Sequence, residues 1–250
     1  MYPIVLYRLI EQIGFPWAVR TIGFIALATL VLPISLLHMR VKPSKARLLV
    51  DWSAFKDLDY VFLVAVGFLA YTGLFVLLFY LSLFAADSIL TDTSLAFYLV
   101  AIFNAGSFVG RTVPNAIADK TGPFDIISLG AILVGVFELC MLTVDNESGL
   151  IALSVVAGIF SGILIGILPL CFITLTKEKS KIGSRVGMGF ALLSLGVLCG
   201  GPGAGGILGT CDGSNWAGVW TFAGATTCVS GFGFLALRIK VFGFNSFFEA

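Results

Sequence analysis

Seven apolar stretches, each long enough to cross a bilayer as a helix, dominate this chain. They lie at residues 18–38, 60–85, 95–117, 124–143, 149–175, 186–209 and 216–237. A spanning helix needs about 20 predominantly apolar residues, and lipid leaves every backbone polar group to be paired inside the segment. We therefore predict an all-α, polytopic membrane protein. The composition agrees, because 58% of the residues are hydrophobic and only 12% are charged.

Loop charges predict the orientation of these stretches. One set of alternate connections carries the basic residues Arg40, Lys42, Lys45, Arg47, Lys56, Lys120, Lys177, Lys179 and Lys181, and the other carries only the acidic residues Asp87, Asp92, Asp145, Glu147 and Asp212. Short loops rich in Lys and Arg stay in the cytoplasm. The N-terminus is therefore predicted to lie outside and the C-terminus in the cytoplasm, with Arg8 and Arg20 as exceptions.

Residues 39–59 interrupt the regular alternation of helix and short connection. We expect them to form an amphipathic linker on the cytoplasmic face. The linker joins residues 1–38 to a six-helix unit at residues 60–237, and a cytoplasmic tail follows at residues 238–250. The segment Met1 to Arg8 has no positive leader and no long apolar centre, so it does not resemble a cleavable signal. We interpret it as the end of a preceding helix.

Small residues predict close helix packing. Gly158, Gly162 and Gly166 recur at four-residue spacing on one helix face, where another backbone can approach closely. The stretch 186–209 holds many glycines around Pro202, which removes one backbone donor and makes the helix easy to bend. Static packing and a flexible element in a gate are both compatible with this pattern.

Arg111 stands deep in the stretch 95–117, about 12 Å along the helix from Asp119. An arginine at a helix centre costs about 2.5–3.5 kcal/mol on insertion scales, which a water-filled cavity or a partner usually offsets. Its guanidinium could hold a carboxylate through two parallel hydrogen bonds. Alternatively, Arg111 extends to the inner interface or ties helix ends together.

Glu138 is the acidic residue placed well inside a predicted helix. Burial disfavours its charged form, so it could bind and release a proton, or it could hydrogen-bond a neighbouring helix. Other polar side chains that could line a cavity are Asn104, Ser107, Tyr71, Tyr80, Thr174 and Ser194. With one His, no metal-ligand cluster and no phosphate loop, we predict no catalytic site, no metal, no cofactor and no nucleic-acid partner.

The run from Asn104 to Gly122 resembles the eighth helix and following inner turn of the major facilitator superfamily. The likeness is to its fungal monocarboxylate-transporter-like branch, in which a Gly-Arg pair inside the helix precedes an Ala-Asp-basic-x-Gly turn. Further similar segments are Tyr2-Pro3, Ile13 to Phe15, Trp17 to Arg20 and Ile22 to Phe24, near its sixth helix, and Arg185 to Gly189 and Gly196 to Leu208, in its eleventh.

This resemblance implies the last seven helices of a 12-helix fold. Residues 1–38 would then be the remnant of an N-terminal half, and a missing half or a second chain becomes an expected partner beside the lipid bilayer. Alternating access around a midplane site is implied, with transport of a small, monocarboxylate-like solute across the plasma membrane. Substrate contact is implied for Arg111, and we predict that the polar residues Asn104 and Ser107 contact the substrate beside it. We predict conformational gating for Asp119, Lys120, Gly122 and Pro202.

The sequence departs from the family pattern at several positions. Ser107 replaces an acidic residue one turn before the arginine, and Asn115, Lys120 and Pro123 replace a glycine, an arginine and a basic residue of the turn. A proton site at Glu138 stays a hypothesis. The alternative function is an inactive fragment or a helix bundle that needs a partner. A seven-helix receptor would share the topology, but its Asn-Pro-x-x-Tyr motif is absent from the last stretch.

Overall fold

The computed structural model describes residues 2–37, 50–89, 93–209 and 214–243. Seven long helices make up most of these residues: α1 (Tyr2–Leu36), α2 (Leu58–Phe84), α3 (Thr93–Thr121), α4 (Pro123–Cys140), α5 (Glu147–Leu175), α6 (Ile182–Leu208) and α7 (Trp216–Phe242). Each contains a segment that is long and apolar enough to cross a membrane. The predicted class and the seven predicted stretches are confirmed.

Short helical turns join or extend these helices: η1 (Trp52–Lys56), η2 (Ala85–Ile89), η3 (Met141–Thr143) and η4 (Lys179–Lys181). Local sequence explains several helix starts. The side chains of Asp57, Asn146 and Asn215 accept hydrogen bonds from the first turns of α2, α5 and α7, as N-cap residues do. Pro123 begins α4, where its missing N–H costs nothing.

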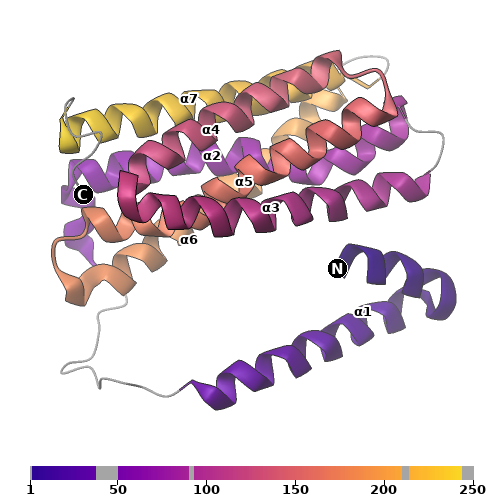
Figure 1. Ribbon diagram of the computed structural model, residues 1–250, viewed down its shortest axis with the longest axis horizontal. Coiled ribbons are helices and arrows are strands. Elements are labelled where there is room, and N and C mark those ends of the chain that lie inside the picture. Colours follow the sequence, from indigo (N-terminus) through magenta and orange to yellow (C-terminus); the bar gives the residue numbers. More distant parts are fainter. Residues whose placement is uncertain (1, 38–49, 90–92, 210–213, 244–250) are drawn as a thin grey trace.

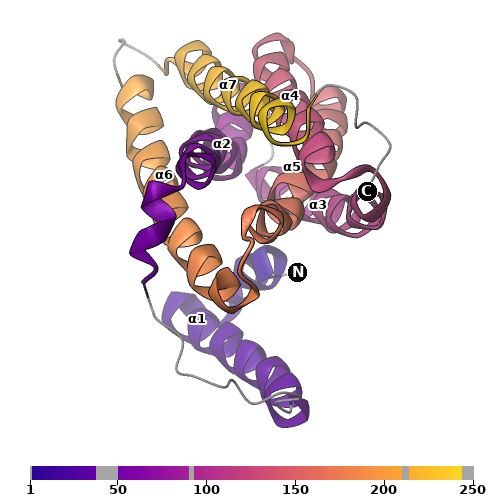
Figure 2. The same cartoon turned by 90° about the vertical axis from the view of Figure 1, so that its left-hand side faces the viewer.

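Helices α2 to α7 form one bundle, with α2 near its centre (Figure 1). Figure 2 shows α2 between α6 and α7, and the same helices are in extensive contact. Two other pairs pack over much of their length, α3 with α5 and α4 with α7. We call the end of the bundle where α2 begins and α7 ends the basic end, and the opposite end the acidic end.

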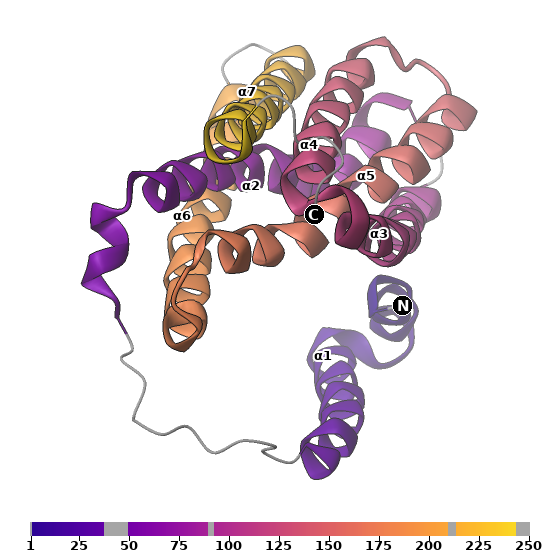
Figure 3. The same ribbon diagram turned by 60° about the vertical axis from the view of Figure 1, so that its left-hand side comes forward.

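Helix α1 lies beside the bundle rather than inside it (Figure 3). It contacts mainly α3, where the Arg8 guanidinium donates to the Tyr98 hydroxyl at 3.3 Å. Gly14 divides α1 at a kink, with a φ of 76° that glycine adopts without a steric penalty. A separate helical segment therefore precedes the kink, at the place where the sequence predicts the end of a preceding helix.

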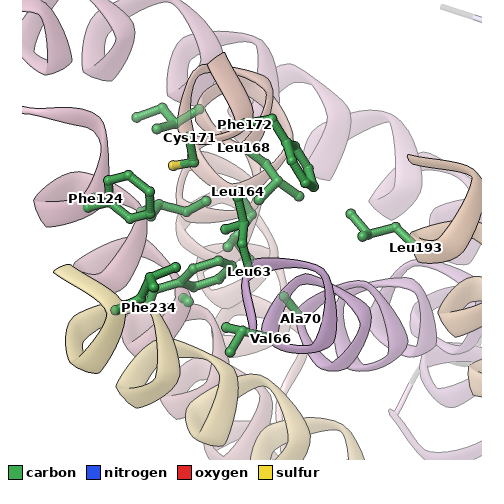
Figure 4. Close-up of a cluster of buried hydrophobic side chains, with 14 of the residues drawn as sticks. Leu63, Val66, Ala70, Phe124, Leu164, Leu168, Cys171, Phe172, Leu193 and Phe234 are labelled. Atoms are coloured by element: carbon green, nitrogen blue, oxygen red, sulfur yellow. The ribbon is translucent and has the colours of Figure 1, made fainter. Parts of the chain in front are cut away.

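The interior of the bundle is filled by large apolar side chains from several helices (Figure 4). Leu63 of α2, Phe172 of α5 and Phe234 of α7 are fully buried in one cluster. A second cluster near the acidic end surrounds Trp220, whose ring lies 5.2 Å from that of Phe84. These contacts fix α2 against α5 and α7, so the polar groups described below stand on a packed scaffold.

The predicted glycine packing face joins α3 to α5. A Cβ atom on Gly158 would overlap the Phe103 carbonyl, and one on Gly162 would overlap the Ser107 carbonyl. On the α3 side, Gly110 lies against the Ile159 carbonyl in the same way. The two backbones therefore touch, which confirms the close-packing interpretation for these glycines. Gly196 and Gly200 of α6 likewise meet Phe68 and Thr72 of α2.

At the basic end, several helices extend past the predicted apolar stretches: α3 to Thr121, α6 back to Ile182 and α7 to Phe242. Helix α7 continues to Phe242 instead of ending at 237, because Arg238 is buried and its Nε lies 2.8 Å from Asp125 Oδ1 of α4. Paired in this way, a charged residue can extend a buried helix face. Of the predicted linker and tail, residues 39–49 and 244–250 lie outside the described residues.

Candidate solute-binding site

Arg111 is held on an exposed face of α3, inside the apolar span Leu95–Asn115. No hydrogen bond or ion pair joins its guanidinium to another described residue. The contrast with other arginines is clear, since Arg185 and Arg238 each pair with a carboxylate. Within the described residues, Arg111 therefore presents five N–H donors without a partner on an exposed face of α3.

Two more polar groups flank Arg111 on α3. Ser107, one turn before it, is 2% exposed, and its Oγ has no hydrogen-bond partner among the described residues. Asn115, one turn after it, donates from Nδ2 to the Arg111 carbonyl at 2.6 Å, while its Oδ1 is buried without a partner. Because buried polar atoms are nearly always hydrogen-bonded, these two atoms mark a place where a polar ligand or water would be stabilised.

Helix α5 positions this polar strip. Gly166 lies so close to α3 that an added Cβ would stand 3.6 Å from Arg111 Cγ and 3.3 Å from Asn115 Nδ2. Gly162 abuts the backbone of Ser107 and Arg111. The two glycines thus allow the aliphatic part of the Arg111 side chain to lie close to α5. A larger residue at either glycine position would push the Arg111 side chain away from α5.

Tyr71 reaches the same region from α2. It is 7% exposed and interacts electrostatically with Arg111. Its hydroxyl makes no hydrogen bond to another residue in the described part of the chain. A tyrosine hydroxyl on a second helix therefore lies within electrostatic range of the Arg111 guanidinium.

Asn104 is less clearly part of this group. Its side chain is exposed, and its Nδ2 donates to the Val100 carbonyl of its own helix at 2.7 Å. The structure therefore brings Ser107 to Arg111 and leaves Asn104 two turns away. The sequence interpretation did not include Asn115 among the candidate site residues, although its position four residues after Arg111 places it on the same helix face.

Glu138 belongs to α4, and its side chain is completely buried where α4 packs against α7. The Thr227 hydroxyl is beside its carboxyl group but donates to the Ala223 carbonyl at 3.0 Å, so neither carboxyl oxygen accepts a hydrogen bond from the described residues. A carboxyl group in such a place is stabilised as the neutral acid, because an unpaired charge away from water is costly.

The residues predicted to act in gating do not form one cluster. Gly122, with a φ of 93°, makes the turn from α3 into α4 at the basic end. Pro202 lies in the part of α6 nearer the acidic end, and α6 runs through it as one helix. The side chains of Asp119 and Lys120 lie outside the described residues.

Two apolar cavities flank the basic end of α2 but do not include Arg111. One, of about 490 Å³, lies between α2, α6 and η1 and is lined by Phe55, Phe68 and Leu192 among others. The other, of about 450 Å³, lies between α2 and α7 and reaches Lys240. Neither resembles a pocket for a charged solute, because their walls are almost wholly apolar.

The chain is similar to several fungal transport proteins. The MFS-type transporter dbaD of Emericella nidulans is 54% identical over 232 residues, which are 93% of this chain and 52% of that protein. The aspyridones efflux protein apdF of the same organism is 35% identical over 83% of the chain and 42% of its own length. The MFS-type transporter pynF of Aspergillus niger is 34% identical over 88% of the chain and 51% of its own length.

The chain is a homologue of the MFS-type transporters. No family model matches it. The chain spans about half the length of the curated relatives it matches. Seven helices are a little over half of the 12 that the superfamily resemblance implies, so this MFS homologue has the size and helix content expected of a C-terminal portion.

Proposed function

We propose that the chain is the C-terminal half of an alternating-access carrier for a small organic anion of the monocarboxylate type. The observation that carries this proposal is Arg111, a cation inside a spanning helix with no carboxylate partner among the described residues. Such a residue is expensive in a membrane, and its usual place is a solute pathway. Transport as the general activity is supported by the homologous transporters.

The chemistry around Arg111 suits a carboxylate. The guanidinium can donate two parallel hydrogen bonds to one carboxylate, which fixes the orientation of the anion as well as its position. Ser107 and Tyr71 supply hydroxyl groups, and Asn115 supplies a free amide oxygen for a hydroxyl group on the solute. Asn104 would contact a solute further along α3. None of these roles requires a cofactor or a metal.

The other half of the carrier would cover the open face of α3. In our proposal the two halves rock about the site near the midplane, while Gly122 and Pro202 allow helix ends to bend and Asp119 and Lys120 close the basic end. The basic end faces the cytoplasm of the plasma membrane, and the N-terminus of this chain lies outside. Export is the direction that the name of the aspyridones relative favours.

Proton coupling through Glu138 is the second part of the proposal. Its carboxyl group is buried without a hydrogen-bond donor, so gain or loss of a proton there would change the packing of α4 against α7. The alternative is a helix bundle that does not transport without a partner, which the half-length match to the relatives favours. In that case, the chain binds its partner through the face that carries Arg111.

The decisive experiment uses a joined carrier, in which the N-terminal half of the Emericella nidulans relative dbaD precedes this chain. We expect Arg111→Lys to weaken transport of labelled monocarboxylates at least tenfold, because lysine keeps the charge but loses the paired hydrogen bonds. Arg20→Lys is the matched control, since Arg20 stacks on Trp17 at 4.9 Å outside the site. Unchanged affinity and rate in Arg111→Lys would refute the anion-binding role.

A further inference from the structure

A strip of aromatic rings follows one face of α2 away from the Arg111 region. Tyr71, Phe75 and Phe79 recur every four residues, and each ring centroid lies 5.7 Å from the next. Phe190 of α6 meets Tyr71 edge-on at 6.2 Å. Each step of four residues advances about 6 Å along the helix, so the three rings cover about 12 Å of the wall toward the acidic end.

Part of this strip is not covered by the chain itself. Phe79 is 49% exposed, whereas Tyr71 at the other end is 7% exposed. Phe75 and Phe190 are half-buried. Tyr71 joins the main buried cluster and Phe75 packs against it, so the strip runs from the packed interior to the exposed ring of Phe79, where a flat apolar group can enter from the acidic end.

The strip ends at polar groups. Tyr71 lies within electrostatic reach of Arg111, and its hydroxyl has no hydrogen-bond partner in the described part of the chain. Beyond Tyr71, toward the basic end, the rings of Phe190, Phe172 and Tyr60 close the wall, with centroids 6.0 Å and 5.7 Å apart. A solute with its charge at Arg111 and Tyr71 can therefore extend its apolar part along Phe75 and Phe79.

We propose that the site selects aromatic carboxylates, with the carboxylate at Arg111 and Tyr71 and the aromatic ring against Phe75 and Phe79. This inference rests on the proposed anion site at Arg111 and adds the class of solute. Aromatic pairs gain from ring geometry beyond the area they bury, by about two- to tenfold in affinity for each pair. A saturated ring of the same size gains only from burial.

The test compares benzoate with cyclohexanecarboxylate, which has the same charge and a similar size but no aromatic ring. Binding to the purified joined carrier in lipid nanodiscs is measured by isothermal titration calorimetry. We expect benzoate to bind at least fivefold more tightly. Phe75→Leu and Phe79→Leu each lower that ratio at least twofold, because leucine keeps the apolar bulk and removes the ring. Phe75→Trp keeps the ratio.

Two control variants separate this inference from the proposed function. Phe232→Leu removes a ring from α7 that is 60% exposed and away from the strip, and it leaves the ratio unchanged. Arg111→Gln weakens both acids by the same factor. If both acids bind equally and both need Arg111, the aromatic inference fails and the anion site stands. If neither acid binds, or if Arg111→Gln leaves the affinity for both acids unchanged, both proposals fail.

Discussion

Arg185 of α6 lies 3.2 Å from Asp51, measured from Nε to Oδ2, although 134 residues separate them. Its Nη1 atom is 3.1 Å from Asp57 Oδ2, and its guanidinium also lies over the Tyr60 ring at 5.7 Å. The end of the linker is thus fastened to α6 at the basic end. A movement of α6 must either carry residues 51–57 along or break these pairs.

We predict that this attachment weakens in acid. Hydrogen bonds from Ser53, followed by Arg185, hold the pKa of Asp51 below its usual value although burial acts in the opposite direction. A carboxyl group with a lowered pKa contributes stability when ionised, so the contribution is present above about pH 4 and is lost as the pH falls further. The measurement is hydrogen exchange at the Ala54 amide, which donates to the Asp51 carbonyl. The protection of this amide should fall as the pH drops below about 4.

At pH 7, Arg185→Gln should lower the protection factor of that amide at least tenfold, because both carboxylates lose their cation. Lys179→Gln is the control, since Lys179 is exposed in the neighbouring turn η4. Equal protection in the wild type and in Arg185→Gln would show that the ion pairs do not hold the linker.

The close contact between α3 and α5 predicts that replacing its glycines by larger residues destabilises the bundle. Gly110→Ala should destabilise the bundle by about 1–3 kcal/mol, because the new Cβ would overlap the Ile159 carbonyl and force the backbones apart. Gly187→Ala, at a position with open space around it, should be neutral or slightly stabilising. Thermal unfolding of the two purified variants in detergent compares them. A similar midpoint for both would contradict the close backbone contact.

The pair between Arg238 and Asp125 predicts a double-mutant result. Removing one partner of a buried pair costs about 3–5 kcal/mol, so Arg238→Gln should be strongly destabilising. Asp125→Asn added to it should restore part of the loss, because the carboxylate is no longer unpaired. Lys240→Gln breaks a pair whose lysine is 60% exposed and should cost about 0–1 kcal/mol. Additive effects at Arg238 and Asp125 would rule out their coupling.

Glu138→Gln should fold normally and change only the response to protons. Glutamine has nearly the same shape as the neutral acid, so the interior between α4 and α7 keeps its packing. In the joined carrier, we expect a proton gradient to accelerate wild-type transport and to have no effect on the variant. A variant that responds to the gradient as the wild type does would assign Glu138 a purely structural role.

The sequence predicted the class and the spans, because apolar stretches of this length leave few alternatives in a bilayer. The depth of Arg111 in the membrane stays a prediction, since the apolar span of α3 ends four residues after it, at Asn115. The sequence did not predict which helices would meet. The four-residue spacing of Tyr71, Phe75 and Phe79 already places them on one helix face, but the direction of that face depends on the rotation of α2 in the bundle. Similarly, Arg185 and Asp51 carry no local signal of their pairing, because their contact depends on how the linker returns to α6.

The need for a second half is measured by comparing transport by this chain alone with transport by the joined carrier. Both are reconstituted into liposomes, and counterflow of labelled benzoate and smaller monocarboxylates is measured at matched protein amounts. We expect counterflow only in the joined form, with loss of activity in its Arg111→Lys variant. Counterflow by the chain alone at a comparable rate would refute the need for an N-terminal half and would indicate that identical chains assemble into a complete carrier.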